Sequence, residues 1–213
     1  MRQVRVAHPA ETVLACARDL ALLDVVLIGD AALHAGDATT ADLLEVSRLR
    51  RRGAPLLRRA IPLMDARSES IFETLLRMLH ATCSIGVDVQ PDLLDDAGTF
   101  VARADLVLSG TCTLHECDGG EHRTPRRHER DLRRERRLLR AGYTRRGYTP
   151  RDILTRPADI IRDADVTLRR AHDPTSLQPW YALLRDSLFT ASGQRRLVRK
   201  LGLAAETADE VAG

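Results

Sequence analysis

The stretch ARADLVLSGTCTLHECDGG, residues 102–120, decides the fold. Two strand-like runs in it, ADLVL and TCTLHEC, flank the turn signal Ser109-Gly110. We expect a hairpin in which position 106 pairs with position 115. That register would bring Asp105 and Glu116 close together at one end of a sheet.

Helix and strand signals precede this hairpin. The run SESIFETLLRMLH, residues 68–80, predicts a helix that begins with a capping box of Ser70 and Glu73. A strand-like run, IGVDV at 85–89, follows, and TFVARADLVL at 99–108 completes the first strand of the hairpin. With TCTLHEC these runs predict an antiparallel meander of three strands.

Helical character returns after the hairpin. Thr124-Pro125, a cap followed by proline, predicts a helix that continues to about Ala141 and stops at Gly142. A short strand, YTRRGYT, and two further helices follow. The order of helix, three strands, helix, strand and helices predicts an α/β (α+β) domain over residues 67–170. Its core would be a small mixed sheet flanked by helices.

The two ends of the chain read as helical. Residues 1–66 carry apolar residues at helical spacing, a Gly-terminated helix before a Thr cap, and a break at Gly53. We expect an all-helical region there. Residues 171–213 predict a linker followed by one helix over roughly 179–202.

Composition narrows the classes of function. Hydrophobic residues make up 44% of the 213 residues, which suffices for a core, but aromatic residues make up only 3%. That scarcity counts against a reader of single-stranded RNA, which stacks bases on aromatic side chains. Lys200 is the only lysine among 33 basic residues, and arginine cannot act as a general base.

The chain has no feature of a secreted or membrane protein. Its four cysteines form no C-x-x-C pair, and no segment has the apolar core of a signal peptide or of a membrane span. We therefore expect a cytoplasmic protein that does not contact a membrane.

Three carboxylates gather at the end of the predicted hairpin. Glu116 and Asp118 are two residues apart, so on a strand they point to the same face as one another. With Asp105 beside them they would repel strongly unless a cation lay between them. Such hard oxygen ligands suit Mg²⁺ or Mn²⁺. The alternative is that these acids only end strands at a polar turn formed by Gly119-Gly120.

Zinc is a less favoured alternative in the same segment, because neighbouring strand positions point to opposite faces of a sheet. Its candidate ligands are Cys112, His115, Cys117 and His122.

A metal site of this kind could hydrolyse phosphodiesters. Bound Mg²⁺ activates water and neutralises charge on phosphate. His122, four residues after Asp118, has an ordinary pKa suited to proton transfer near pH 7. Glu73 could add a further carboxylate from the preceding helix. The structural alternatives are that His122 only enters a helix and that Glu73 only caps one.

A strongly basic segment follows the acids. Residues 123–146 contain eleven arginines against three acidic residues, which leaves a net charge of +8. Leu132, Leu138 and Leu139 form only a thin apolar stripe. We predict contact with the phosphates of DNA rather than a merely solvated face. The expected contact residues are Arg123, Arg126, Arg127, Arg130 and Arg134.

Residues 68–170 resemble the very-short-patch-repair-like endonuclease domains of the PD-(D/E)XK nuclease superfamily. The matching motifs are S-E-S-x-x-E at 68–73, the strand with Asp105, E-x-D-G at 116–119 followed by His122, R-x-x-E-R-D at 126–131, A-G-Y at 141–143 and R-D-I-L at 151–154. The resemblance implies a restriction-endonuclease-like core in which Asp105 and Glu116 bind metal. Asp118 stands where the superfamily usually has lysine, which leaves the general base unassigned.

Residues 1–65 resemble the segment that precedes such domains in AbiEi-like proteins of abortive-infection, type IV toxin–antitoxin systems. Those proteins usually begin with a winged-helix DNA-binding domain, which is not visible in this sequence. Two functions stay open. The first is a Mg²⁺-dependent endonuclease acting on DNA, or on RNA, in phage defence. The second is a nuclease-fold module without turnover that binds DNA, a protein partner or a second copy of the chain.

Overall fold

The computed structural model of the protein describes residues 6–118 and 125–203, and the side chains of the second range from residue 129 onward. The described residues fall into two units. One unit contains those of residues 1–66 and 181–213, and the other contains those of residues 67–180.

The first unit is helical, as the sequence predicts. Thr39 opens its third helix through a reciprocal capping box with Asp42. Gly53 has a positive φ of 94°, and a Cβ there would lie 2.6 Å from the carbonyl oxygen of Leu14, so only glycine fits. The helices are α1 (Pro9–Asp19), α2 (Leu22–His34), α3 (Thr40–Ser47), α4 (Ala54–Ala60), the 3₁₀ helix η1 (Ile61–Leu63) and α10 (Ala191–Lys200).

The prediction of a single C-terminal helix over 179–202 is wrong. The structure has two helices there, α9 (Gln178–Asp186) and α10, and a 3₁₀ helix, η2 (Pro174–Leu177), precedes them. The hydroxyl of Thr190 accepts the backbone N–H of Gly193 at 3.1 Å and starts α10. A Cβ on Gly193 would lie 1.9 Å from the carbonyl oxygen of Ser187, so glycine allows the close approach at this break.

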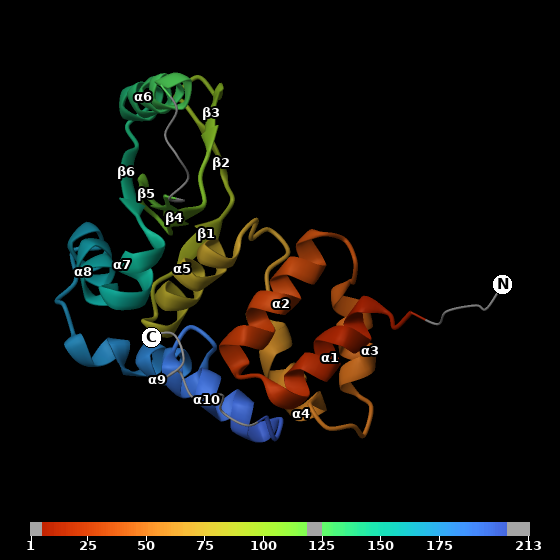
Figure 1. Ribbon diagram of the computed structural model, residues 1–213. Helices are drawn as coiled ribbons and strands as arrows, with labels where there is room; N and C mark the ends of the chain where they lie inside the picture. Colours follow the sequence, from red (N-terminus) through yellow and green to blue (C-terminus); the bar gives the residue numbers. More distant parts are fainter. Residues whose placement is uncertain (1–5, 119–124, 204–213) are drawn as a thin grey trace. The chain divides into compact units, whose positions relative to one another are not determined.

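The second unit is built on a four-stranded mixed sheet with the order β1-β4-β5-β6. Its strands are β1 (Val87–Val89), β4 (Leu106–Leu108), β5 (Thr113–Cys117) and β6 (Thr144–Tyr148). The pairs β1–β4 and β4–β5 are antiparallel. The pair β5–β6 is parallel, and α6 (Pro125–Arg140) makes the crossover that a parallel pair requires (Figure 1). The predicted α+β class, with helices flanking a small mixed sheet, is confirmed.

The hairpin register predicted from the sequence is also confirmed, since Leu106 pairs with His115. The long strand predicted over 99–108 is divided. Its first half, β3 (Phe100–Arg103), pairs with β2 (Asp92–Leu94), which the sequence did not predict. Gln90 has a positive φ of 51° and bends the ladder between the two sheets.

Helix α5 (Ile71–Thr82) buries Leu75, Leu76 and Leu79 completely, as its predicted stripe requires. Only half of its predicted capping box forms. The Ser70 hydroxyl accepts the backbone N–H of Glu73 at 3.2 Å. The Glu73 carboxylate does not return to Ser70. It accepts the backbone N–H of Glu69 at 2.9 Å and the side-chain amide of Gln90 at 2.8 Å.

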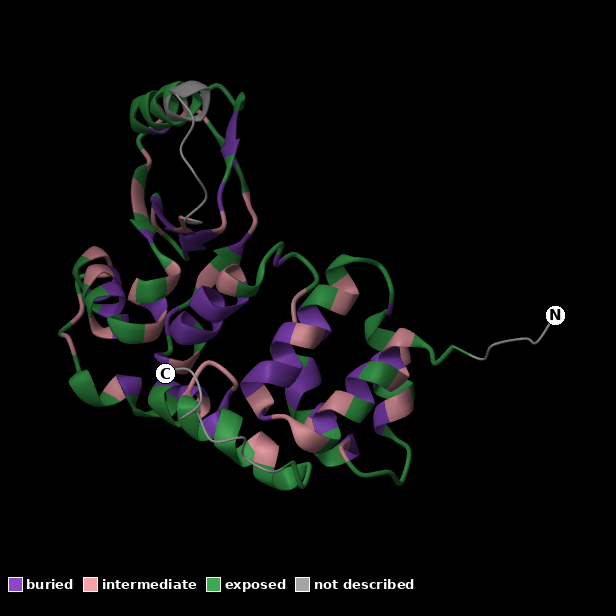
Figure 2. Cartoon of the chain, viewed as in Figure 1, coloured by how far each residue is buried: buried purple, intermediate pink, exposed green. Residues whose placement is uncertain are grey.

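Helix α6 has little apolar anchorage. Leu138 is buried in the cluster that also holds Leu93, Val101 and Leu114, whereas Leu139 is 73% exposed. Figure 2 shows most of the described part of α6 as exposed. No helix among residues 6–118 and 125–203 has both the length and the apolar character to cross a membrane.

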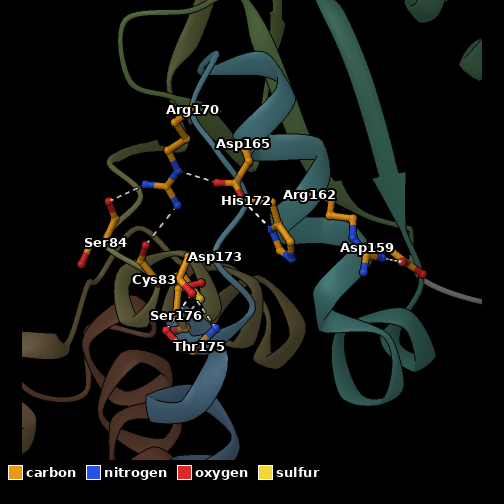
Figure 3. A network of polar contacts seen from close by, with 10 residues as sticks. All are labelled: Cys83, Ser84, Asp159, Arg162, Asp165, Arg170, His172, Asp173, Thr175 and Ser176. Carbon is orange, nitrogen blue, oxygen red and sulfur yellow. Dashed lines mark hydrogen bonds and ion pairs between the residues drawn. The ribbon is translucent and has the colours of Figure 1, made fainter.

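Helices α7 (Pro150–Thr155) and α8 (Pro157–Thr167) complete the unit, and a buried carboxylate fixes the end of α8. Asp165 accepts hydrogen bonds from Arg170 Nε and, at 2.7 Å, from His172 Nδ1 (Figure 3). Arg170 also donates to the backbone carbonyls of Cys83 at 3.3 Å and Ser84 at 3.4 Å. This network ties the end of α8 to the end of α5.

Replacing Asp165 with alanine should lower the free energy of unfolding of residues 67–180 by about 3 kcal/mol, because it removes the buried acceptor shared by Arg170 and His172. Urea denaturation followed by the fluorescence of Trp180, the chain's only tryptophan, measures this loss. Asp159→Ala is the matched control on α8. Its pair with Arg162 is exposed, so the loss should stay below about 1 kcal/mol. Equal losses would contradict the role given to Asp165.

Candidate active site

The ends of β4 and β5 bring the predicted carboxylates together. Asp105 precedes β4, Glu116 belongs to β5, and Asp118 follows it. Because Leu106 pairs with His115, Asp105 stands across from Glu116. The carboxylate of Asp105 accepts the backbone N–H of Cys117 at 2.9 Å, which fixes it against β5.

Asp105 is a partly buried acid that forms no ion pair among the described residues. Burial raises its pKa to about 7, and the nearby carboxylates of Glu73 and Glu116 raise it too. The hydrogen bond from the backbone of Cys117 and the nearby charge of Arg134 oppose this rise. Among the residues that the structure describes, no arginine, lysine or histidine forms an ion pair with Asp105.

Glu116 is in the opposite situation, since two arginines neutralise it. It is only 4% exposed. Arg134 of α6 holds both of its oxygens, with Nη1–Oε2 at 2.8 Å and Nη2–Oε1 at 2.5 Å, and Arg145 of β6 donates through Nε to Oε2. Burial raises the pKa of Glu116, but the hydrogen bonds from Arg134 and Arg145 outweigh it and hold this pKa below its ordinary value.

Arg145 also joins Glu116 to Asp118, because its Nη2 donates to Asp118 Oδ1. The backbone N–H of Asp118 donates to the carbonyl of Tyr148 at 2.8 Å. Gly147 pairs with Glu116 across the parallel strands, and a Cβ there would lie 2.2 Å from Asp118 Oδ2. Glycine at 147 therefore leaves the space that the Asp118 carboxylate occupies.

The structure describes only part of the predicted site. It brings together Asp105, Glu116 and Asp118, with Glu73 close enough to act on the pKa of Asp105. His122 and Arg123 lie outside the described residues, as do the side chains of Arg126 and Arg127. The remaining predicted phosphate contacts differ from one another, because Arg130 is exposed whereas Arg134 binds Glu116 and the carbonyl of Arg103 at 2.7 Å.

Arg145 is the site residue that the sequence did not single out. It counted only as one charge of the basic segment. The signal that could have found it is the pairing of β5 with β6, which sets Glu116 beside Gly147 and leaves Arg145 two residues away on the same face. That pairing joins parallel strands, so no short turn in the sequence reveals its register.

The donor set has the chemistry of a site for a hard divalent cation. Asp105 and Glu73 offer carboxylate oxygens that bind no arginine among the described residues. Arg134 and Arg145 hold Glu116, so a cation would have to compete with both arginines for this carboxylate. In the described arrangement no group of three or more His, Cys, Asp or Glu side chains can hold a metal ion.

Behind Glu116, on the other face of β5, lies a buried histidine pair. His80 donates from Nδ1 to the carbonyl of Leu76 at 2.7 Å, so its Nε2 accepts the Nδ1–H of His115 at 2.9 Å. Tyr148 lies 3.5 Å from His115 Nε2 and donates to Asp163 at 3.0 Å. Burial lowers the pKa of His80 to about 4 and that of His115 to about 2. Both rings are therefore neutral at pH 7 and fix β5 to α5.

The His80→Gln variant should lose less stability in acid than the wild-type chain. The contribution of a buried neutral histidine to the free energy of unfolding is fully present above about pH 6.5. It decreases as the pH falls from there toward about 4, because in this range only the unfolded chain takes up the proton. Between about pH 7.5 and about pH 5 the variant should be spared about 2 kcal/mol of that loss. Urea denaturation followed by Trp180 fluorescence measures it. Identical pH slopes in the two proteins would contradict the neutral state of His80.

No protein-family model, no curated protein and no solved structure matches this chain. The functional assignment therefore rests on the residues of the chain and on their geometry.

Proposed function

We propose that residues 67–180 form a restriction-endonuclease-like domain that hydrolyses phosphodiester bonds of DNA with the help of Mg²⁺ or Mn²⁺. The observation that carries this proposal is the convergence of Asp105, Glu116 and Asp118 at one end of the sheet, beside the cationic helix α6. The succession of α5, an antiparallel meander, α6 and a parallel strand supports it.

Each side chain has a role in this reaction. Asp105 and Glu116 would hold the cation, with Asp118 beside them, and the cation would activate water and neutralise charge on the phosphate. Arg134 and Arg145 present guanidinium groups at the same point, and their planar forks match the oxygens of a phosphate. His122 stays the candidate for proton transfer.

A specific observation favours a second function, which is binding without turnover. Both oxygens of Glu116 already bind arginines, so this carboxylate serves as the buried anchor of an ion-pair network. A domain of that kind would hold DNA on the exposed arginines of α6, or would bind a protein partner or a second copy of the chain. The phage-defence or toxin–antitoxin setting belongs to either version of the proposal.

Wild-type protein should nick a supercoiled plasmid in Mg²⁺ or Mn²⁺ but not in EDTA. Asp105→Asn should slow the nicking at least about a hundredfold, because the loss of a cation ligand removes several kcal/mol of transition-state stabilisation. Gel electrophoresis of the plasmid over time measures both rates.

Asp88→Asn is the matched control, because Asp88 is an exposed acid on β1. It should cut as fast as the wild type. Tight plasmid binding without cleavage in either metal would reject hydrolysis and leave the binding module. Equal cutting by Asp105→Asn and the wild type would reject the proposed site.

Replacing Arg126, Arg127 and Arg130 with glutamine should weaken binding to DNA of any sequence, since phosphate contacts carry no sequence code. The slope of log K against log salt should flatten by about 0.9 for each phosphate that the variant no longer neutralises. Fluorescence anisotropy of a labelled duplex in EDTA measures the affinity and the slope. The control replaces Arg48, Arg50 and Arg52, three exposed arginines of the other unit. If both triple variants behave alike, α6 is not the phosphate-binding surface.

A further inference from the structure

A small pocket lies between the tip of the β2–β3 hairpin and the C-terminal half of α6. It has a volume of about 290 Å³. Its lining includes Asp95, Thr99, Phe100, Val101, Arg137 and Arg140. None of Asp105, Glu116 and Asp118 belongs to the lining. The pocket is therefore separate from the carboxylates, and none of the roles assigned to them uses it.

The pocket is cationic. Arg137 and Arg140 are exposed, and neither has an acidic partner among the described residues. The one acid in the lining, Asp95, is engaged in the hairpin turn. Its Oδ1 accepts the backbone N–H groups of Ala97 at 3.0 Å and Thr99 at 2.8 Å. Two arginines without carboxylate partners beside an acid that caps a turn give this pocket the charge that complements phosphate.

Phe100 gives the same pocket an aromatic wall. It is 56% exposed, whereas Phe72 and Phe189, the other phenylalanines of the chain, are partly buried. Its cross-strand partner Leu94 is 47% exposed, so the tip of the hairpin carries an open apolar patch. Exposed aromatic surface next to arginines is the combination on which unpaired bases stack while their phosphates are neutralised.

We propose that this pocket binds one unstacked nucleobase of a single-stranded or frayed nucleic acid, with the base on Phe100 and the flanking phosphates on Arg137 and Arg140. The inference rests on the proposed function, in which nucleic acid is the ligand. The volume of about 290 Å³ lies just below the range of about 300–1,000 Å³ for pockets that bind drug-sized ligands, which suits one base. A partner helix, about 10 Å across, needs a longer groove.

Anisotropy titrations of a labelled 5′ oligo-dT strand and of a blunt duplex, both in EDTA, test the pocket without cleavage. Phe100→Ala should weaken binding of the single strand about tenfold, the typical effect of removing one base–aromatic stack, and should leave duplex affinity within about twofold. Phe100→Tyr, which keeps the ring, should bind the single strand as the wild type does. Arg137→Gln with Arg140→Gln should weaken binding and flatten its salt dependence.

Leu139→Ala is the matched control, because Leu139 is an exposed apolar residue of α6 outside the pocket lining. It should bind both nucleic acids unchanged. Unaltered single-strand affinity in Phe100→Ala, or equal losses for strand and duplex, would overturn the pocket while plasmid nicking still supports the proposed function. Failure of the wild-type chain to bind either nucleic acid overturns both proposals. Trp180 fluorescence in urea verifies that Phe100→Ala is folded.

Discussion

The buried carboxylate of Glu116 is the constraint on which the domain depends. It joins β5 to the crossover helix α6 through Arg134 and to β6 through Arg145. A parallel strand pair cannot close through a short turn, so its crossover must be held by tertiary contacts. Apolar contacts contribute little to holding α6 in place, because Leu138 is buried whereas Leu139 is exposed to solvent. A carboxylate without partners would be costly at this depth, so the arginines and the acid each require the other.

The ion pairs of Glu116 with Arg134 and Arg145 also affect how a cation could bind for the proposed reaction. A cation at Asp105 and Glu116 would meet less competition at Asp105, whose carboxylate is hydrogen-bonded to the backbone N–H of Cys117 and to no arginine among the described residues. At Glu116 the cation competes with two guanidinium groups whose bonds are charge-assisted. If an arginine gives way, it stays tethered by its own element beside the cation, with its donors free for phosphate oxygens. Exchange of arginine for metal and capture of phosphate would then be one event.

Local patterns in the sequence predicted the fold where local physics decides it. Alternation and the Ser109-Gly110 turn gave the hairpin and its register, and caps and glycines gave most helices. The bend at Gln90 was not predicted, because a positive φ at a non-glycine residue comes from tertiary context. The pairing of Glu116 with Arg134 and Arg145 was not predicted for a similar reason. A run of arginines reveals its net charge but not which member turns inward, and that choice depends on pairing between β5 and β6.

The spacing along α6 shows how one helix can serve as both scaffold and binding surface. Residues at i, i+4 and i+7 share a face, so Arg130, Arg134 and Arg137 form one stripe along it. Arg134, in the middle, is fixed on Glu116, and the residues one turn to either side are exposed. A nucleic acid strand that followed this stripe would pass the carboxylates between two cationic contacts and would end at Phe100. The anchor that holds the helix in place would thus also align its binding face with the acids.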